Sequence, residues 1–510
     1  MERNEEQNAR VQLPFMEKAL PVELNAEIAL PDYRSEISRL LWVRPTLLPP
    51  MHFIGNGKVD FSGSVCYHIL YVGADAALYG AEHEEPYQFS VPLESLSDFE
   101  SGTVPELCVS VVPDAVVSRV LAPRKLSVRC RLHAQLQGYA VKNLTPQLQG
   151  EYGELYRLCT AAENGRVTAG EPEALELSGK LTVAPAEGEL RVIDAVGSLT
   201  VPRVTADDEG VHCDGEAVIR LLLTREGEER SAPFVAECRI PFEQQLALTG
   251  LPPMASARAH GAIREVRSTV EGDDVMLEVS GSIVAEGQGE EAVLLCGDLF
   301  SAGHGAEYRS KEERLWRAGP CGNRNFSVSG EKTLAELGLA ADAECILAIA
   351  DGELRERSAE GDKTALTGEV CCHLLYRQSG EYGIADFSIP FRTFFDGEWD
   401  QAACVAAVPG CRISIVREGE ALRADAEVYL SVRAGRTVPT AMLASAAFHP
   451  AEQRDRADLE ICYPHAGESL WEVSKRYGTS PEAIAAANAI SADAPGAGSS
   501  LEGVRYLIIP

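Results

Sequence analysis

The chain has 510 residues, of which 45% are hydrophobic and 24% are charged, which is the balance of an ordinary folded protein and excludes an intrinsically disordered one. Its 46 basic and 77 acidic residues give a formal net charge of −31, spread along the whole sequence. Such a field repels phosphate backbones and anionic lipids, so we expect no binding to nucleic acid and no direct membrane insertion.

The amino-terminal residues carry no targeting pattern. Residues 1–8 are polar and charged, no apolar region follows them, and no run of 18 apolar residues occurs in the chain. We therefore expect a cytoplasmic protein with neither a signal peptide nor a transmembrane segment. The fourteen cysteines are irregularly spaced and include no C-x-x-C pair, so we expect reduced thiols that act as small buried residues.

Two markers recur three times along the first 450 residues. The first is a glycine in an apolar strand pattern, with spacings of 152 and 153 residues, at Gly63, Gly215 and Gly368. The second is a proline that follows an apolar residue, with a spacing of 149 residues both times, at Pro92, Pro241 and Pro390. Two markers with nearly the same period predict three copies of one domain.

Each copy closes on a segment in which apolar and polar residues alternate. These segments are residues 126–134, 277–283 and 422–432. Alternation with a period of two predicts a strand with one buried face, so we predict a mostly β protein with three repeated antiparallel, sandwich-like domains. Within the repeats, helices are expected only at residues 150–159 and 333–339.

The repeats and their boundaries predict five segments. They are a first β-rich repeat at 1–147, a second at 148–300, a third at 301–447, a linker at 448–458 and a small carboxy-terminal domain at 459–510. The alternation lapses at residues 142–174, 288–310 and 435–458, which we expect to be exposed boundaries between protease-resistant cores.

The last fifty residues predict two short helices between two short strands. Ser469 and Glu472 have the spacing of a capping box, so a helix should begin at Leu470. Gly478 suits the left-handed position that ends it. Ser480 followed by proline predicts the start of a second helix, which should run to about residue 488. Residues 459–463 and 506–509 are the β-rich flanks, and the expected order is βααβ.

Residues 466–484 and 501–510 resemble the LysM family of small binding modules. The resemblance implies a surface for a glycan or a partner protein, made of Gly467, Glu468, Ser469, Leu470, Trp471, Asn488, Ile490 and Leu501. For Trp471 we expect packing in the small core, and the alternative is a place on the partner surface. The sequence departs from the family pattern at Pro464, Ala466 and Glu502 and in a long loop at 491–500, which reshapes the border of the glycan groove.

Three β repeats followed by a LysM domain resemble the SPOCS-domain proteins of spore-forming clostridia, and the layout is similar to the SipL-like family of coat morphogenesis proteins. The most similar segment is the lead-in at residues 28–41. The resemblance implies a mother-cell protein at the forespore surface and spore coat, which binds the coat-basement ATPase SpoIVA. The alternative is a protein that binds peptidoglycan or another N-acetylglucosamine glycan of the spore cortex or cell wall.

No segment carries a catalytic or metal-binding motif. Two pairs have the residue types of metal ligands, namely Cys66 with His68 and Cys371 with His373. The same positions of the second repeat hold a valine and Arg220, which cannot form an equivalent site. We therefore expect a protein that is not an enzyme and that has no catalytic residues, no metal and no cofactor.

Overall fold

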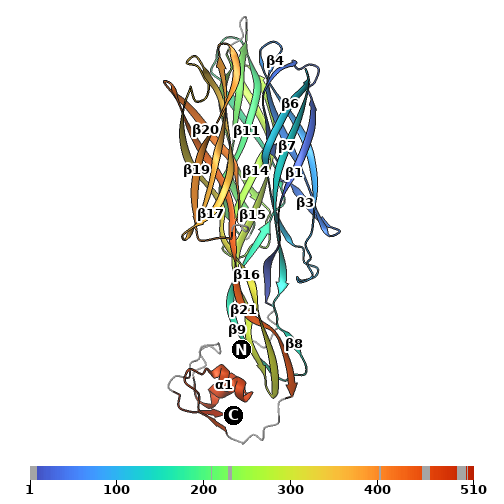
Figure 1. Cartoon of the computed structure of the whole chain (residues 1–510), viewed down its shortest axis with the longest axis vertical. Helices are drawn as coiled ribbons and strands as arrows, with labels where there is room; N and C mark the ends of the chain where they lie inside the picture. Colours follow the sequence, from blue (N-terminus) through green and yellow to red (C-terminus); the bar gives the residue numbers. More distant parts are fainter. Residues whose placement is uncertain are drawn as a thin grey trace.

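The computed structural model describes residues 9–207, 209–227, 232–400, 404–450, 460–490, 501 and 504–510. Strands make up 74% of the chain and helices 3%, which confirms the mostly β fold. The molecule is elongated, with a broad body of long strands, a narrower stalk below it and a small module with two helices at the far end of the stalk (Figure 1).

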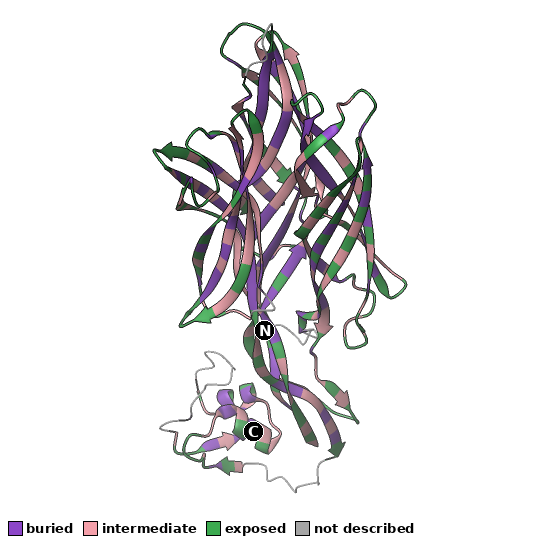
Figure 2. Ribbon diagram, turned by 45° about the horizontal axis from the view of Figure 1, so that its top comes forward, coloured by how far each residue is buried: buried purple, intermediate pink, exposed green. Residues whose placement is uncertain are grey.

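Each repeat is built from six strands in two antiparallel sheets. In the first repeat these are β1 (Arg10–Ala29), β2 (Ile37–Leu47), β4 (Lys58–Gly73), β5 (Leu78–Pro92), β6 (Glu106–Ala122) and β7 (Lys125–Asn143), with the short β3 (Met51–Gly55) added. One sheet has the order β1-β7-β6, and in the other β4 lies between β2 and β5. Buried and exposed residues alternate along these strands, as Figure 2 shows.

The second and third repeats have the same strand order. The second contains β10 (Glu173–Thr182), β11 (Glu189–Ala206), β12 (Val211–Glu226), β13 (Phe234–Leu246), β14 (Ser256–Glu271) and β15 (Asp274–Ser301). The third contains β16 (His304–Thr333), β17 (Glu344–Glu360), β18 (Lys363–Gln378), β19 (Glu381–Asp396), β20 (Val405–Glu418) and β21 (Ala421–Pro450). Their sheets have the orders β10-β15-β14 with β11-β12-β13, and β16-β21-β20 with β17-β18-β19.

The recurring glycine lies at the centre of one sheet in every repeat, and an aromatic residue lies directly opposite it on the neighbouring strand. The three pairs are Gly63 with Tyr87, Gly215 with Phe242, and Gly368 with Phe391. A Cβ atom on these glycines would lie 2.6, 2.3 and 2.5 Å from the aromatic Cζ, which is closer than side chains approach. The ring therefore covers the glycine, and this contact explains why the glycine recurs.

The same pairing corrects the second sequence marker. In the first repeat, the proline that precedes the aromatic residue is Pro86, whereas Pro92 lies at the end of β5 opposite Lys58. The structural equivalents of Pro86 are Pro241 and Pro390. The constant 149-residue spacing was therefore wrong for the first repeat, because a second proline six residues later mimicked the marker.

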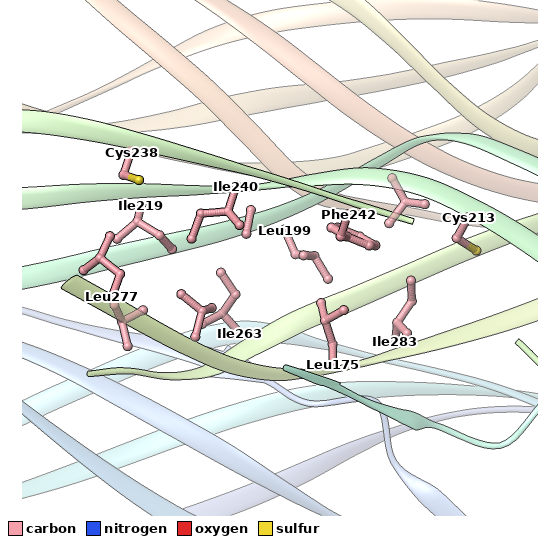
Figure 3. Close-up of a cluster of buried hydrophobic side chains, with 14 of the residues drawn as sticks. Leu175, Leu199, Cys213, Ile219, Cys238, Ile240, Phe242, Ile263, Leu277 and Ile283 are labelled. Carbon is pink, nitrogen blue, oxygen red and sulfur yellow. The ribbon is translucent and has the colours of Figure 1, made fainter. Parts of the chain in front are cut away.

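The alternating segments predicted to close each repeat are the first parts of β7, β15 and β21. Each of these strands is the middle strand of its sheet, and the buried face of the segment packs against the sheet that contains the glycine. Figure 3 shows this core in the second repeat, where Ile219 and Ile240 of one sheet face Leu277 and Ile283 of the other.

The stalk is formed by strands that continue out of the body. Residues 286–301 of β15 pair with β9 (Leu155–Ala169), and residues 304–318 of β16 pair with residues 435–450 of β21. The short β8 (Gln147–Gln149) adds to β21 in parallel. Apolar side chains from the starts or ends of all three repeats meet in its interior, and they include Val11, Val293, Leu315 and Met442.

The structure overturns two expectations from the sequence, the helices within the repeats and the exposed boundaries between them. Residues 155–169 form β9 and not a helix, and residues 334–338 form a turn, although Thr333 and Glu336 make the reciprocal hydrogen bonds of a helix start. The described parts of 142–174, 288–310 and 435–450 are mostly paired strands, so the lapse of alternation does not mark exposed linkers. Residues 451–459 lie outside the described residues. The division into separate folding units stays a prediction.

Buried charged side chains connect the three sandwiches where they meet. Arg433 of the third repeat donates to Glu286 of the second at 2.9 Å and to the hydroxyl of Tyr139 of the first at 2.9 Å. Arg258 also donates to Glu286, at 2.8 Å. Arg433, Arg258 and Glu286 are all nearly fully buried. One carboxylate thus neutralises guanidinium groups from two repeats.

Asp194 is a buried carboxylate of β11 that should weaken the folded state at neutral pH. Burial raises its pKa to about 6, and the opposing charge of His68 only partly offsets this. Because the folded pKa lies above the ordinary value of 3.8, stability falls as the pH rises from about 4 to about 6. We expect Asp194→Asn to increase the unfolding free energy by about 2 to 3 kcal/mol at neutral pH and to leave it nearly unchanged below about pH 4. Urea unfolding at both pH values measures the difference.

Asp214→Asn is the matched control, because Asp214 lies on the adjacent β12 with its side chain 45% exposed. It should change stability by less than about 1 kcal/mol at either pH. An equal gain from Asp194→Asn at both pH values would show that the charge on this carboxylate is not what limits stability.

Candidate binding site

The carboxy-terminal module has the expected βααβ order. Its elements are β22 (Glu460–Cys462), α1 (Leu470–Tyr477), α2 (Pro481–Ala487) and β23 (Leu507–Ile509). The capping box is confirmed, because the amide of Glu472 donates to Ser469 Oγ at 3.3 Å and the amide of Ser469 donates to Glu472 Oε2 at 2.8 Å. Gly478 has a φ of 60° and ends α1 in the left-handed conformation.

Several predicted site residues serve the module's own structure. Leu470 and Leu501 are buried in its core, and Ile490 packs against that core. The side chain of Asn488 donates to the carbonyl of Ile508 at 2.7 Å and accepts from its amide at 2.7 Å, so it ties α2 to β23. These residues therefore hold the module together.

The first loop of the module is the part of the predicted site that remains accessible. Ala466 and Gly467 are exposed, and Gly467 has a φ of 83° with open space around its Cα. Glu468 forms an ion pair with Arg476 and accepts from the amide of His465 at 2.9 Å, which fixes the shape of the loop. The second predicted loop, residues 491–500, lies outside the described residues.

Trp471 contacts the stalk and does not belong to the module's core. Its Nε1 donates to Asp298 Oδ2 of β15 at 2.9 Å, and its ring meets Phe300 edge to face with 5.0 Å between centroids. Phe300 in turn stacks on Tyr156 of β9, also at 5.0 Å. The expectation of core packing was thus wrong, and the surface that Trp471 joins belongs to the same chain.

Lys475 strengthens the same contact from one turn further along α1. Its Nζ lies 2.5 Å from Asp298 Oδ1 and 3.9 Å from the centroid of the Tyr308 ring. Residues four positions apart lie on one face of a helix, so Trp471 and Lys475 both bind the carboxylate of Asp298. We call the stalk residues Tyr156, Asp298, Phe300 and Tyr308 the LysM seat.

Little in the amino-acid sequence indicates the LysM seat. Asp298 projects from β15 just after a register shift between Cys296 and Asp298, and such a bulge re-aims the side chains that follow it. A bulge of this kind depends on which strand pairs with which, and this pairing joins residues more than 100 positions apart. The aromatic residues near positions 156, 300 and 308 were the available signal, but their partner on α1 could not be identified from the sequence.

The histidines that resembled metal ligands belong to another recurring pair. Within each repeat, a basic residue of the central strand lies opposite an acidic residue of the next strand. The pairs are His68 with Glu82 at 3.1 Å, Arg220 with Glu237 at 3.1 Å, and His373 with Asp386 at 2.7 Å. Among the described residues, no group of three or more His, Cys, Asp or Glu side chains could hold a metal ion.

Residues 466–501 match the family model of the LysM domain. No curated protein and no solved structure was found to match the chain. The match supports a role in binding glycans such as peptidoglycan or in protein interaction, and it extends over the module only. In the described part of the chain, no helix has the length and apolar character needed to cross a membrane.

Proposed function

We propose that this chain is a non-enzymatic assembly factor that binds a protein partner through its LysM end, with the three sandwiches and the stalk as scaffold. By family resemblance, the proposed partner is a coat-basement protein such as SpoIVA, and the proposed location is the mother-cell side of the forespore surface and spore coat. The choice of a protein partner, and not a glycan, rests on one observation on the module.

That observation is an apolar patch on the outer face of the small β22–β23 sheet. Cys462, Leu507 and Ile509 point into the core, so the alternation of the strands turns Ile461 and Ile508 outward. Ile461 is 48% exposed, and the flanking Tyr463 and Tyr506 are 71% and 56% exposed. We call Ile461, Tyr463, Tyr506 and Ile508 the sheet patch. Exposed tyrosines beside aliphatic side chains are typical of protein-binding hot spots.

The junction of the three repeats supports a structural role for the body. A cavity of about 20 Å³ there is lined by Arg44, Arg220 and Arg412 among others, which is room for about one water molecule. Arg44 forms an ion pair with Asp351, and Arg412 forms one with Glu216. These arginines therefore join one repeat to another, and we propose that they have no substrate to bind.

The test compares binding of the full chain to purified SpoIVA with binding to peptidoglycan and chitin oligomers. The double variant Tyr463→Ser, Tyr506→Ser removes the tyrosines of the sheet patch without opening the core, and we expect it to weaken SpoIVA binding about tenfold or more. The matched variant Ala466→Arg crowds the first loop and should leave SpoIVA binding unchanged. Biolayer interferometry measures both.

The glycan alternative rests on the LysM match and on the exposed first loop. It predicts the reverse pattern: chitin oligomers bind the wild type, Ala466→Arg abolishes that binding, and the sheet-patch variant keeps it. That pattern without any affinity for SpoIVA would replace our proposal with the glycan role. Thermal unfolding of each variant checks that the module remains folded.

A further inference from the structure

Two cysteines of the stalk lie directly opposite each other. Cys159 of β9 and Cys296 of β15 are register partners in an antiparallel pair. Directly opposite residues in such a pair have Cα atoms about 4.5 to 5.5 Å apart, which is within the range that a disulfide spans. In the strand pairings that the structure describes, no other two cysteines face each other in this way.

The two thiols already interact in the reduced protein. The neighbouring Cys296 side chain lowers the pKa of Cys159, with burial opposing this effect and the charge of Arg157 helping, while the Cys296 thiol donates to the carbonyl of Asp298 at 3.3 Å. A thiol with a lowered pKa is more often in the thiolate form, which is the form that attacks a disulfide. Cys159 is half-buried, whereas Cys296 is buried, so an oxidant would reach Cys159 first.

Cys159 and Cys296 lie on the same two strands as most of the LysM seat. Three residues before Cys159 is Tyr156, which stacks on Phe300, and Phe300 meets Trp471. Two residues after Cys296 is Asp298, which holds both Trp471 and Lys475. A covalent link between β9 and β15 at this level would fix the two strands that carry most of the LysM seat.

We propose that Cys159 and Cys296 form a reversible redox site that closes to a disulfide under a low-molecular-weight disulfide and thereby locks the LysM seat. The Cys159 thiolate attacks one sulfur of the oxidant and releases one thiol, which leaves a mixed disulfide on Cys159. The Cys296 thiol gives its proton to solvent and attacks the Cys159 sulfur, which releases the second thiol. Two protein thiols are oxidised to one disulfide, and the oxidant disulfide is reduced to two thiols.

The test exposes the full chain to oxidised glutathione, followed by alkylation and peptide mass spectrometry. We expect the wild type to lose two hydrogen atoms, to give one linked peptide pair that contains Cys159 and Cys296, and to unfold about 5 °C or more higher than the reduced protein. Dithiothreitol should reverse all three changes. In Cys296→Ser, oxidation should stop at a single glutathione on Cys159, because the resolving thiol is missing.

Cys345→Ser is the matched control, because Cys345 is also half-buried but lies opposite Tyr376. This variant should close the Cys159–Cys296 disulfide like the wild type. The proposal is overturned if Cys159 and Cys296 remain open to alkylation in excess oxidised glutathione, or if the linked peptides contain other cysteines. It is also overturned if oxidised glutathione raises the unfolding temperature of Cys159→Ser as much as that of the wild type.

Discussion

Replacement of Glu286 by glutamine is expected to destabilise the whole body by about 3 to 5 kcal/mol. Glu286 accepts hydrogen bonds from Arg258 and Arg433, and both guanidinium groups are nearly fully buried. Glutamine keeps the size of the side chain but removes the negative charge that both guanidinium groups share. Two buried positive charges would then repel each other without compensation, and guanidinium unfolding of the full chain measures the loss.

The same carboxylate should make stability depend on pH in the acid range. Burial favours the neutral form of Glu286, but Arg258 and Arg433 outweigh it and hold the pKa at about 2, below the ordinary 4.5. A lowered folded pKa contributes stability above the unfolded value, and this contribution is lost as the pH falls from about 4.5 to about 2. In Glu286→Gln, the slope of stability against pH over this window should be smaller than in the wild type.

Glu290→Gln is the matched control on the same strand. Glu290 pairs with Arg317 at 2.7 Å, but both side chains are about 30% exposed, so solvent screens the pair. We expect a loss of less than about 1 kcal/mol from this change. Equal losses from the two variants would show that the buried charges do not bind the repeats together.

Gly368→Ala is expected to destabilise the third repeat by about 2 to 4 kcal/mol. The added Cβ would lie 2.2 Å from the carbonyl oxygen of Glu353 and 2.5 Å from Cζ of Phe391. The ring could turn away, but the backbone of the neighbouring strand β17 would have to shift. Chemical unfolding followed by tryptophan fluorescence measures the loss.

Substitutions at two other glycines serve as comparisons for this prediction. At Gly410, the nearest atoms to an added Cβ are 3.4 and 3.7 Å away, so Gly410→Ala should change stability by less than about 1 kcal/mol. At Gly63, the three nearest atoms all belong to the side chain of Tyr87, so the effect of Gly63→Ala should fall between the two. If Gly410→Ala lost as much stability as Gly368→Ala, the contact with the aromatic ring would not be the reason why glycine recurs at this position in the three repeats.

The sequence predicted those parts of the structure that depend on short-range patterns. The period of two along residues 126–134 identified a strand with one buried face, because alternation is fixed by the strand itself. The capping box at Ser469 and the glycine at 478 fixed the limits of α1 for the same reason. The three repeats were recognised because a glycine opposite an aromatic residue recurs in each of them.

The parts that depend on contacts between distant strands were not predicted. Residues 155–169 have no simple alternation because β9 packs in a stalk where ribbons from all three repeats meet. Trp471 was placed in the module's core because nothing near it in sequence indicates Asp298, 173 residues away. Of the predicted site, the first loop stays accessible, whereas the sheet patch was missed because single exposed tyrosines carry no pattern.

The course of β15 and β21 has a mechanical consequence. Both strands run without a break from the body into the stalk, and the LysM seat lies near the far end of β15. A pull on the LysM domain along the long axis would therefore act parallel to the strands. Under such a load the backbone hydrogen bonds of a ribbon are strained together, because no single bond can open before its neighbours. The stalk would resist tension as a tether, while a sideways force would peel its ribbons apart one bond at a time.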